Sequence, residues 1–109
     1  MMKQEMFDAW MQDFNREAYL CEVHEWAVLY AHAKTILKNI DKWTKDKSID
    51  TEIYLIPNTA AVRYEPLGVA CIYGTWNFPF TLVFRPMVEA IAAGNCVVIR
   101  PSEMAPACA

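Results

Sequence analysis

The chain has 109 residues, enough for one small domain, and 55% of them are hydrophobic, more than such a domain usually carries. Its formal net charge is -3 and it has no cluster of Lys and Arg, which argues against binding nucleic acid or anionic lipid through bulk charge. Because a short chain can hide only a limited apolar surface, the surplus predicts a piece of something larger.

Residues 3–43 have apolar side chains at spacings of three and four, which predicts two consecutive amphipathic helices. Asn15 and Arg16 mark the expected break, although the absence of Gly and Pro leaves one long bent helix as the alternative. Residues 42–50 are rich in charge and predict an exposed turn. We therefore expect residues 1–50 to form an N-terminal helical segment.

A β-hairpin is expected over residues 51–64. Residues 51–56 are rich in β-branched and aromatic side chains, Pro57 and Asn58 are turn residues, and residues 60–64 resume an extended pattern. The sequence therefore predicts strands over residues 51–56 and 60–64.

Residues 65–109 predict the beginning of an α/β domain. Residues 69–73 and 96–100 are apolar on both faces, as in buried parallel strands. Residues 79–93 between them have a helical pattern that ends at Gly94 and Asn95, with Pro86 expected to kink or split the helix. This order predicts the first right-handed βαβ unit of a parallel Rossmann-like sheet, an incomplete domain because the sheet needs further strands. Residues 101–103 predict the entry to another helix.

Ligands of open parallel sheets bind beyond the carboxyl ends of the strands, where helix N-termini attract negative groups. Here those ends are residues 74–79 and 100–103. Neither carries the G-x-G-x-x-G fingerprint or a phosphate-binding loop with Lys and Ser/Thr. Ordinary Rossmann dehydrogenases and P-loop enzymes are therefore disfavoured.

Four blocks within residues 65–103, EPLGV, GTWNFPF, AIAAGN and RPSE, carry a family resemblance. In this order and at these separations they resemble the opening of the cofactor domain in the aldehyde dehydrogenase superfamily. The earlier segments DFNREAY and WTKDK are similar to the class 3 or fatty aldehyde dehydrogenase branch. The resemblance implies an N-terminal fragment of an NAD(P)-dependent enzyme, with an oligomerisation hairpin over residues 51–64 and the start of the NAD(P)-binding domain over residues 65–109.

The resemblance implies that Asn77 is the side-chain amide that stabilises the oxyanion when a thiolate adds to an aldehyde carbonyl. A rigidly held NH2 donor suits this task, because its hydrogen bond strengthens as negative charge grows on the oxygen. From the residues alone, the preferred interpretation is that Asn77 caps the helix that follows.

The resemblance also implies a cofactor site for NAD or NADP along the two loops. The expected residues line the dinucleotide path or face the adenosine ribose, and they are Gly74, Thr75, Trp76, Arg100, Pro101, Ser102 and Glu103. Glu103 would accept hydrogen bonds from ribose hydroxyls. Without the resemblance, Trp76 is interpreted as a core indole, and Ser102 with Glu103 as a helix N-cap pair.

Arg100 stands where the family usually has lysine. A guanidinium can bind a 2′-phosphate through two hydrogen bonds, which would tilt preference toward NADP, whereas the nearby Glu103 carboxylate would oppose that phosphate.

The family's cysteine nucleophile and glutamate base are expected downstream of these residues. None of the four cysteines matches the nucleophile motif: Cys71 and Cys96 fall in strands predicted to be buried and inert, and neither Cys21 nor Cys108 has a basic neighbour. The lack of Cys-x-x-Cys spacing and of a signal-like segment predicts a reducing, cytoplasmic compartment.

No metal site is expected. His24-Glu25 resembles the start of a zincin helix, but the second histidine would have to stand at Val28. The apolar runs are also far shorter than the roughly 20 residues that span a bilayer, so membrane anchoring is expected only through a more distant C-terminus.

The expected function is oxidation of an aldehyde to a carboxylate by a homo-oligomeric enzyme, most simply a dimer, of which these residues alone would be inactive. The alternative is a non-catalytic fragment that pairs with a full-length relative through its exposed apolar surface.

Overall fold

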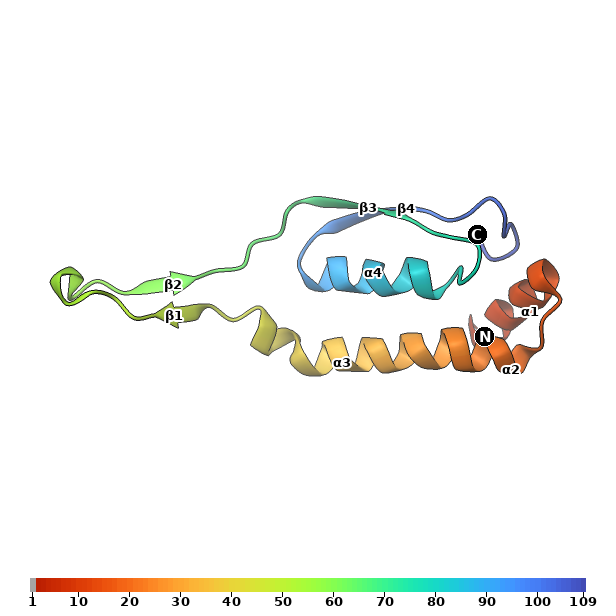
Figure 1. The fold of residues 1–109 in the computed structure, drawn as a ribbon, viewed down its shortest axis with the longest axis horizontal. Coiled ribbons are helices and arrows are strands. Elements are labelled where there is room, and N and C mark those ends of the chain that lie inside the picture. The colour runs from red at the N-terminus through yellow and green to blue at the C-terminus, as the bar shows by residue number, and fades with distance from the viewer. Residues whose placement is uncertain (1) are drawn as a thin grey trace.

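The computed structural model describes residues 2–109, and they form an elongated body of 67 × 24 × 21 Å. Figure 1 shows three stacked layers that each run parallel to the long axis. They are helix α3 (Ala27–Trp43), helix α4 (Thr81–Ala92) in the middle, and a sheet made of β3 (Val69–Tyr73) and β4 (Cys96–Arg100). The hairpin of β1 (Lys47–Ile49) and β2 (Ala60–Val62) projects past one end of these layers. The predicted α/β fold with N-terminal helices, hairpin and βαβ unit is confirmed.

The predicted break in the N-terminal helices is also confirmed. Helix α1 (Met2–Phe14) ends at Asn15, whose φ of 49° lies in the left-handed region that Asn tolerates better than most residues. The chain then re-enters a helix at α2 (Ala18–Cys21). A π-helical stretch, Glu22–Trp26, joins α2 directly to α3.

The hairpin exists, but the prediction of its first strand over residues 51–56 is wrong. The antiparallel register pairs Lys47 with Val62 and Ile49 with Ala60, so the strand lies in the charged segment predicted as an exposed turn. Cross-strand contacts explain this register: Arg63 bonds to the Asp46 carboxylate at 3.2 Å and Lys47 Nζ lies 2.8 Å from the Tyr64 hydroxyl.

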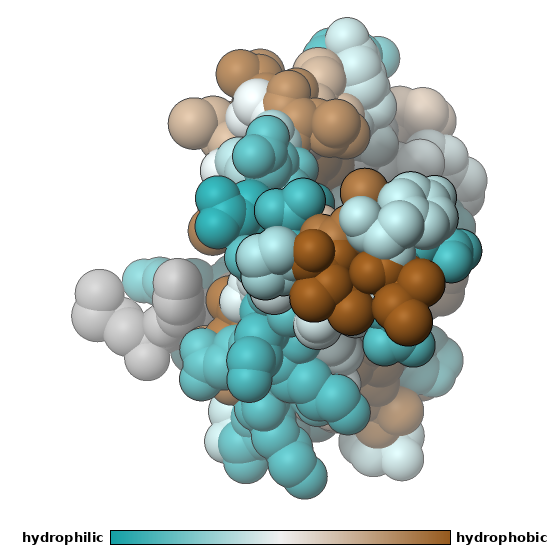
Figure 2. Space-filling view, turned by 90° about the vertical axis from the view of Figure 1, so that its left-hand side faces the viewer, coloured by the Kyte–Doolittle hydropathy of each residue, from teal (hydrophilic) through white to brown (hydrophobic). Residues whose placement is uncertain are grey.

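With that register, the apolar residues predicted as a strand fall in the connection between the strands. They include a 3₁₀ turn, Ile53–Leu55. Figure 2 views the molecule from the end at which the hairpin projects, and it shows a hydrophobic patch facing the viewer. The most exposed large hydrophobic residues at the tip are Ile53 at 82% and Tyr54 at 77%. Residues with high β-propensity therefore lie here outside the paired strands.

Both parallel strands match their predicted ranges. Val69 pairs with Cys96 and Tyr73 with Arg100, and the crossover helix α4 packs on one face of the sheet. Pro86 lies inside α4 without splitting it. Gly94, with φ +84°, ends the helix, and the Asn95 side chain accepts from Gly68 N and donates to Ala90 O.

The prediction that these strands are buried on both faces is wrong for the described residues. Cys71 and Cys96, predicted to be buried, are exposed, and so are Val69 and Val98. The physical reason is that α4 covers only one face, where Ile72 is buried.

The compact core lies at the end of the molecule opposite the hairpin. Trp10, Cys21 and Phe80 form its buried centre, so α1, α2 and the start of α4 meet there. Among residues 2–109, no helix is long and apolar enough to cross a bilayer.

Candidate functional site

The carboxyl ends of β3 and β4 lie side by side and carry the predicted site residues. Gly74 N donates to Arg100 O at 2.8 Å, which joins the two loops where they leave the sheet. A Cβ on Gly74 would lie 2.4 Å from Val83 Cγ2 and 3.3 Å from Pro101 Cα. Only glycine therefore lets the first loop approach α4 and the second loop this closely.

Asn77 is exposed in the first loop and does not cap α4. The N-cap position of α4 is Phe80, with no side-chain hydrogen bond, so the interpretation of Asn77 as a helix cap is wrong. Instead the Thr75 hydroxyl donates to Asn77 Oδ1 at 2.7 Å. Since the amide oxygen is engaged, this contact orients the amide and leaves its NH2 group as a directed donor.

Trp76 is not a core residue. Its side chain is 45% exposed, so the interpretation as a core indole is wrong. The following Phe78 ring lies 6.4 Å from the His24 ring, which brings the π-helical stretch next to this loop.

The second loop presents Arg100 and Glu103 to solvent. The Arg100 guanidinium lies 3.4 Å from Glu103 Oε2, with the two side chains 62% and 74% exposed, so the pair is a weak surface contact. Ser102 stabilises the turn that follows, because its Oγ accepts from Met104 N and its backbone oxygen accepts from Ala105 N. Residues 103–108 form turns.

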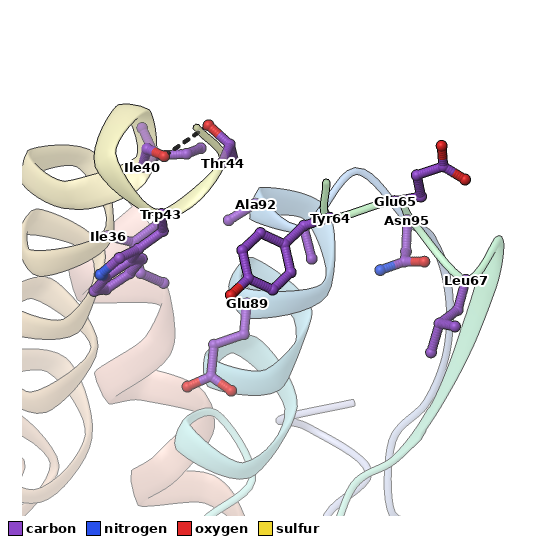
Figure 3. A pocket seen from close by; sticks show the side chains of 11 residues that line it. Ile36, Ile40, Trp43, Thr44, Tyr64, Glu65, Leu67, Glu89, Ala92 and Asn95 are labelled. Carbon is purple, nitrogen blue, oxygen red and sulfur yellow. Dashed lines mark hydrogen bonds between the residues drawn. The ribbon is translucent and has the colours of Figure 1, made fainter. Parts of the chain in front are cut away.

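Two cavities flank α4. One of about 300 Å³ lies where the two loops meet the start of the helix, and its lining is largely apolar: Pro79, Phe80, Val83, Phe84, Ile99, Pro101, Cys108 and Ala109. The other, of about 480 Å³, lies between the C-terminal ends of α3 and α4 and residues 64–67 (Figure 3), and none of the predicted site residues lines it. Of the predicted site residues, Pro101 lines the first cavity.

Sequence reasoning missed a buried carboxylate behind the first loop. Glu25 is 0% exposed and accepts a hydrogen bond from Thr81 N, while the Thr81 hydroxyl donates to His24 O at 3.3 Å. Burial raises the pKa of Glu25, although hydrogen bonds from Thr81 and Phe80 oppose this. The sequence did contain a signal, because Glu25 lies four residues after Cys21 and four before Leu29 and so shares their apolar helix face.

A second carboxylate was also missed. Asp13 accepts from Ala107 N at 3.0 Å and from Cys108 N at 2.9 Å. Desolvation acts to raise the pKa of Asp13, but the hydrogen bonds from Ala107 and Cys108 outweigh it and hold the pKa below its ordinary value. Asp13 therefore ties α1 to the segment after β4.

The two thiols that are at least partly buried, Cys21 and Cys108, are poor nucleophiles because their pKa values are raised. Burial, with the charges of Glu25 and Glu22, raises the pKa of Cys21 to about 11. Burial, with the nearby Asp13 carboxylate, raises the pKa of Cys108 to about 12. Within residues 2–109, no group of three His, Cys, Asp or Glu side chains could hold a metal ion.

Comparison with known proteins gives a family match and several relatives. The model of the aldehyde dehydrogenase family matches residues 6–109. An aldehyde dehydrogenase of Craterostigma plantagineum is 40% identical over 103 residues, which are 94% of this chain and 22% of that protein. Aldehyde dehydrogenase family 3 member B1 of Mus musculus is 39% identical over 105 residues, covering 96% and 22%.

A solved structure has the same fold over these residues. The substrate-bound state of AldH from Staphylococcus aureus superposes with a TM-score of 0.91 at 34% identity, covering 96% of this chain and 23% of that one. The chain thus spans about a fifth of the length of the relatives it matches.

The raised pKa of Glu25 predicts a pH dependence of stability. Glu25 binds its proton more tightly in the folded chain, so its contribution is fully present below pH 4.5 and is lost as the pH rises through its raised folded pKa. Urea denaturation at a series of pH values should show this fall in the free energy of unfolding, and Glu25→Gln should abolish it. The exposed Asp41→Asn should leave it unchanged. A fall that persists in Glu25→Gln would assign it to another group.

Proposed function

The chain belongs to the aldehyde dehydrogenase family, and we propose that it contributes the oxyanion donor and part of the cofactor site to an enzyme that oxidises aldehydes to carboxylates with NAD or NADP. The observation that carries the proposal is the meeting of the Asn77 loop and the Glu103 loop at the carboxyl edge of β3 and β4.

Asn77 is the proposed catalytic residue. When a thiolate adds to the aldehyde carbonyl, negative charge develops on the carbonyl oxygen, and a held NH2 donor stabilises it more in the transition state than in the substrate. The hydrogen bond from Thr75 to Asn77 Oδ1 supports this role, because it aims the donor side of the amide away from Thr75.

The thiolate is proposed to come from outside these 109 residues. Cys21 and Cys108 have raised pKa values, which oppose formation of the nucleophilic anion. Cys71 and Cys96 lie within β3 and β4, and neither belongs to the loop that holds Asn77. All four are free cysteines, which agrees with the proposed cytoplasmic compartment.

The two loops fit a dinucleotide in three respects. Glycine at position 74 allows close approach of the backbone, the largely exposed Glu103 carboxylate can accept from ribose hydroxyls because it is held only by the weak surface contact with Arg100, and exposed Trp76 offers an apolar surface. When bound, the cofactor supplies the acceptor for the hydride that leaves the substrate. The remaining proposed contacts are Thr75, Arg100, Pro101 and Ser102.

The exposed hairpin favours a homo-oligomer, and a dimer is the proposed assembly. Its tip exposes Ile53, Tyr54 and Ile56, a contiguous apolar patch of the kind that marks protein interfaces. The same patch supports the second candidate function, a non-catalytic chain that pairs with a full-length relative. Aldehyde-dependent reduction of NAD(P) by the natural gene product separates the two functions.

Replacing the proposed donor should lower turnover. In the natural gene product that contains this sequence, Asn77→Ala should reduce kcat by about 10²–10³, because one oxyanion donor is lost. Asn77→Asp, which keeps the shape but loses both N–H donors, should reduce it at least as much. Asn39→Ala is the matched control, since that amide bonds only to its own helix at Thr35 O. Unchanged kcat in both Asn77 variants would contradict the proposal.

Cofactor preference should respond to Arg100. Arg100→Lys removes the planar guanidinium next to Glu103, so the affinity for NADP should fall relative to NAD by about tenfold if the guanidinium binds the 2′-phosphate. Titration of each cofactor by intrinsic fluorescence measures the ratio, and Arg63→Lys in the hairpin is the control. A ratio that does not move shows that Arg100 has no part in the choice.

The hairpin tip should set the assembly state. Ile53→Lys places a charge in the most exposed part of the patch and should shift the natural gene product toward the monomer, as measured by light scattering after gel filtration. The comparable change Leu37→Lys, at an exposed position of α3, should leave the mass unchanged. If both variants keep the wild-type mass, the tip is not the interface.

A further inference from the structure

The N-terminal helices contact each site loop through a carboxylate, Glu25 for the first loop and Asp13 for the second. Glu25, in the π-helical stretch, accepts from the N–H of Thr81, which is 56 residues away in sequence. Asp13, at the end of α1, accepts from the N–H groups of Ala107 and Cys108, which are 94 and 95 residues away. These long-range hydrogen bonds join the helical segment to the βαβ unit.

Each carboxylate bonds at a specific point in its loop. Thr81 is the first residue of α4, where amides have no partner within the helix and where the helix dipole favours a negative charge. Residues 105–109 form an isolated turn, in which Ala109 N donates to Ala105 O. Both carboxylates therefore satisfy amides in a segment that follows a strand.

The site loops are consequently held at both ends. At the sheet, the hydrogen bond from Gly74 N to Arg100 O joins them at 2.8 Å. At its far end the first loop is held where Glu25 bonds to Thr81, four residues after Asn77. The second loop is held where Asp13 bonds to Ala107, four residues after Glu103. If the hydrogen bond at the far end of a loop were lost, the loop residues between that point and the sheet would be free to move.

We propose that Glu25 and Asp13 are positioning residues for the reaction, Glu25 for the oxyanion donor Asn77 and Asp13 for the cofactor contacts Ser102 and Glu103. The inference rests on the proposed function of these loops. In this proposal the helical segment positions both site loops, and the two effects can be tested separately because each carboxylate holds one loop.

Amide hydrogen exchange tests the positioning independently of activity. In the natural gene product, Glu25→Ala should speed exchange in residues 74–81 by about tenfold and leave residues 101–108 at the wild-type rate, and Asp13→Ala should do the reverse. Asp41→Ala and Asp8→Ala, exposed carboxylates on α3 and α1, are the matched controls. A uniform rise throughout the chain in both variants would overturn the proposal, because it would show a general loss of stability.

Steady-state kinetics test the division of tasks. Glu25→Ala should lower kcat by about 10²-fold with little change in the cofactor KM, as expected for a misplaced catalytic group. Asp13→Ala should raise the cofactor KM by about tenfold and retain kcat. Equal effects on kcat and KM in the two variants would contradict separate positioning.

Conservative variants distinguish a loss of positioning from unfolding as the cause of the kinetic changes. Glu25→Gln and Asp13→Asn keep an oxygen that accepts the backbone N–H, so they should restore most of the lost kcat and KM respectively. Failure of both to restore function, with folding intact by circular dichroism, would overturn the proposal. Absence of turnover in the wild type would contradict the proposed function instead, and the exchange pattern alone would then decide the positioning.

Discussion

The buried carboxylate of Glu25 at the first amide of α4 is the contact on which the arrangement of this molecule depends. A carboxyl group with no exposed surface is costly to ionise, so burial raises the pKa of Glu25, and hydrogen bonds from the start of a helix offset part of this cost. The contact lies beside the core of Trp10, Cys21 and Phe80. It therefore fixes the point at which the helical segment and the βαβ unit meet.

From that point the position of the site follows. The start of α4 sets the end of the first loop, Gly74 brings that loop against β4, and the second loop continues to the amides held by Asp13. The polar groups with proposed roles are exposed at this edge, whereas the groups that hold them are partly or fully buried. Rigid support beneath an exposed reactive group is the arrangement that oxyanion stabilisation requires, because the donor must be in place before charge develops.

The surplus of hydrophobic residues can be located in the structure. Part of it lies at the hairpin tip and on the sheet face that α4 does not cover, where Ile53, Val69 and Val98 are all exposed, and part lies elsewhere, as at Leu37 on α3 and at Leu67. An uncovered face of a parallel sheet is unusual, since such sheets are normally covered on both sides. The chain spans about a fifth of the length of its relatives.

The sequence by itself determined the local elements and the family. Periodicity located the break near Asn15, both parallel strands and the crossover helix, because each depends on residues near in sequence. The four motif blocks were sufficient for the family, which the match over residues 6–109 bears out.

Tertiary structure alone decided what depends on distant partners. The first hairpin strand moved to Lys47–Ile49 because contacts with Arg63 and Tyr64 set the register, against the local preference of residues 51–56. Exposure of Cys71 and Cys96 depends on which face α4 covers. Asp13 resembles an ordinary surface acid in the sequence, and Glu25 is marked there only by its place on an apolar helix face. Only the fold brings their partners, 94 and 56 residues away, within hydrogen-bonding distance.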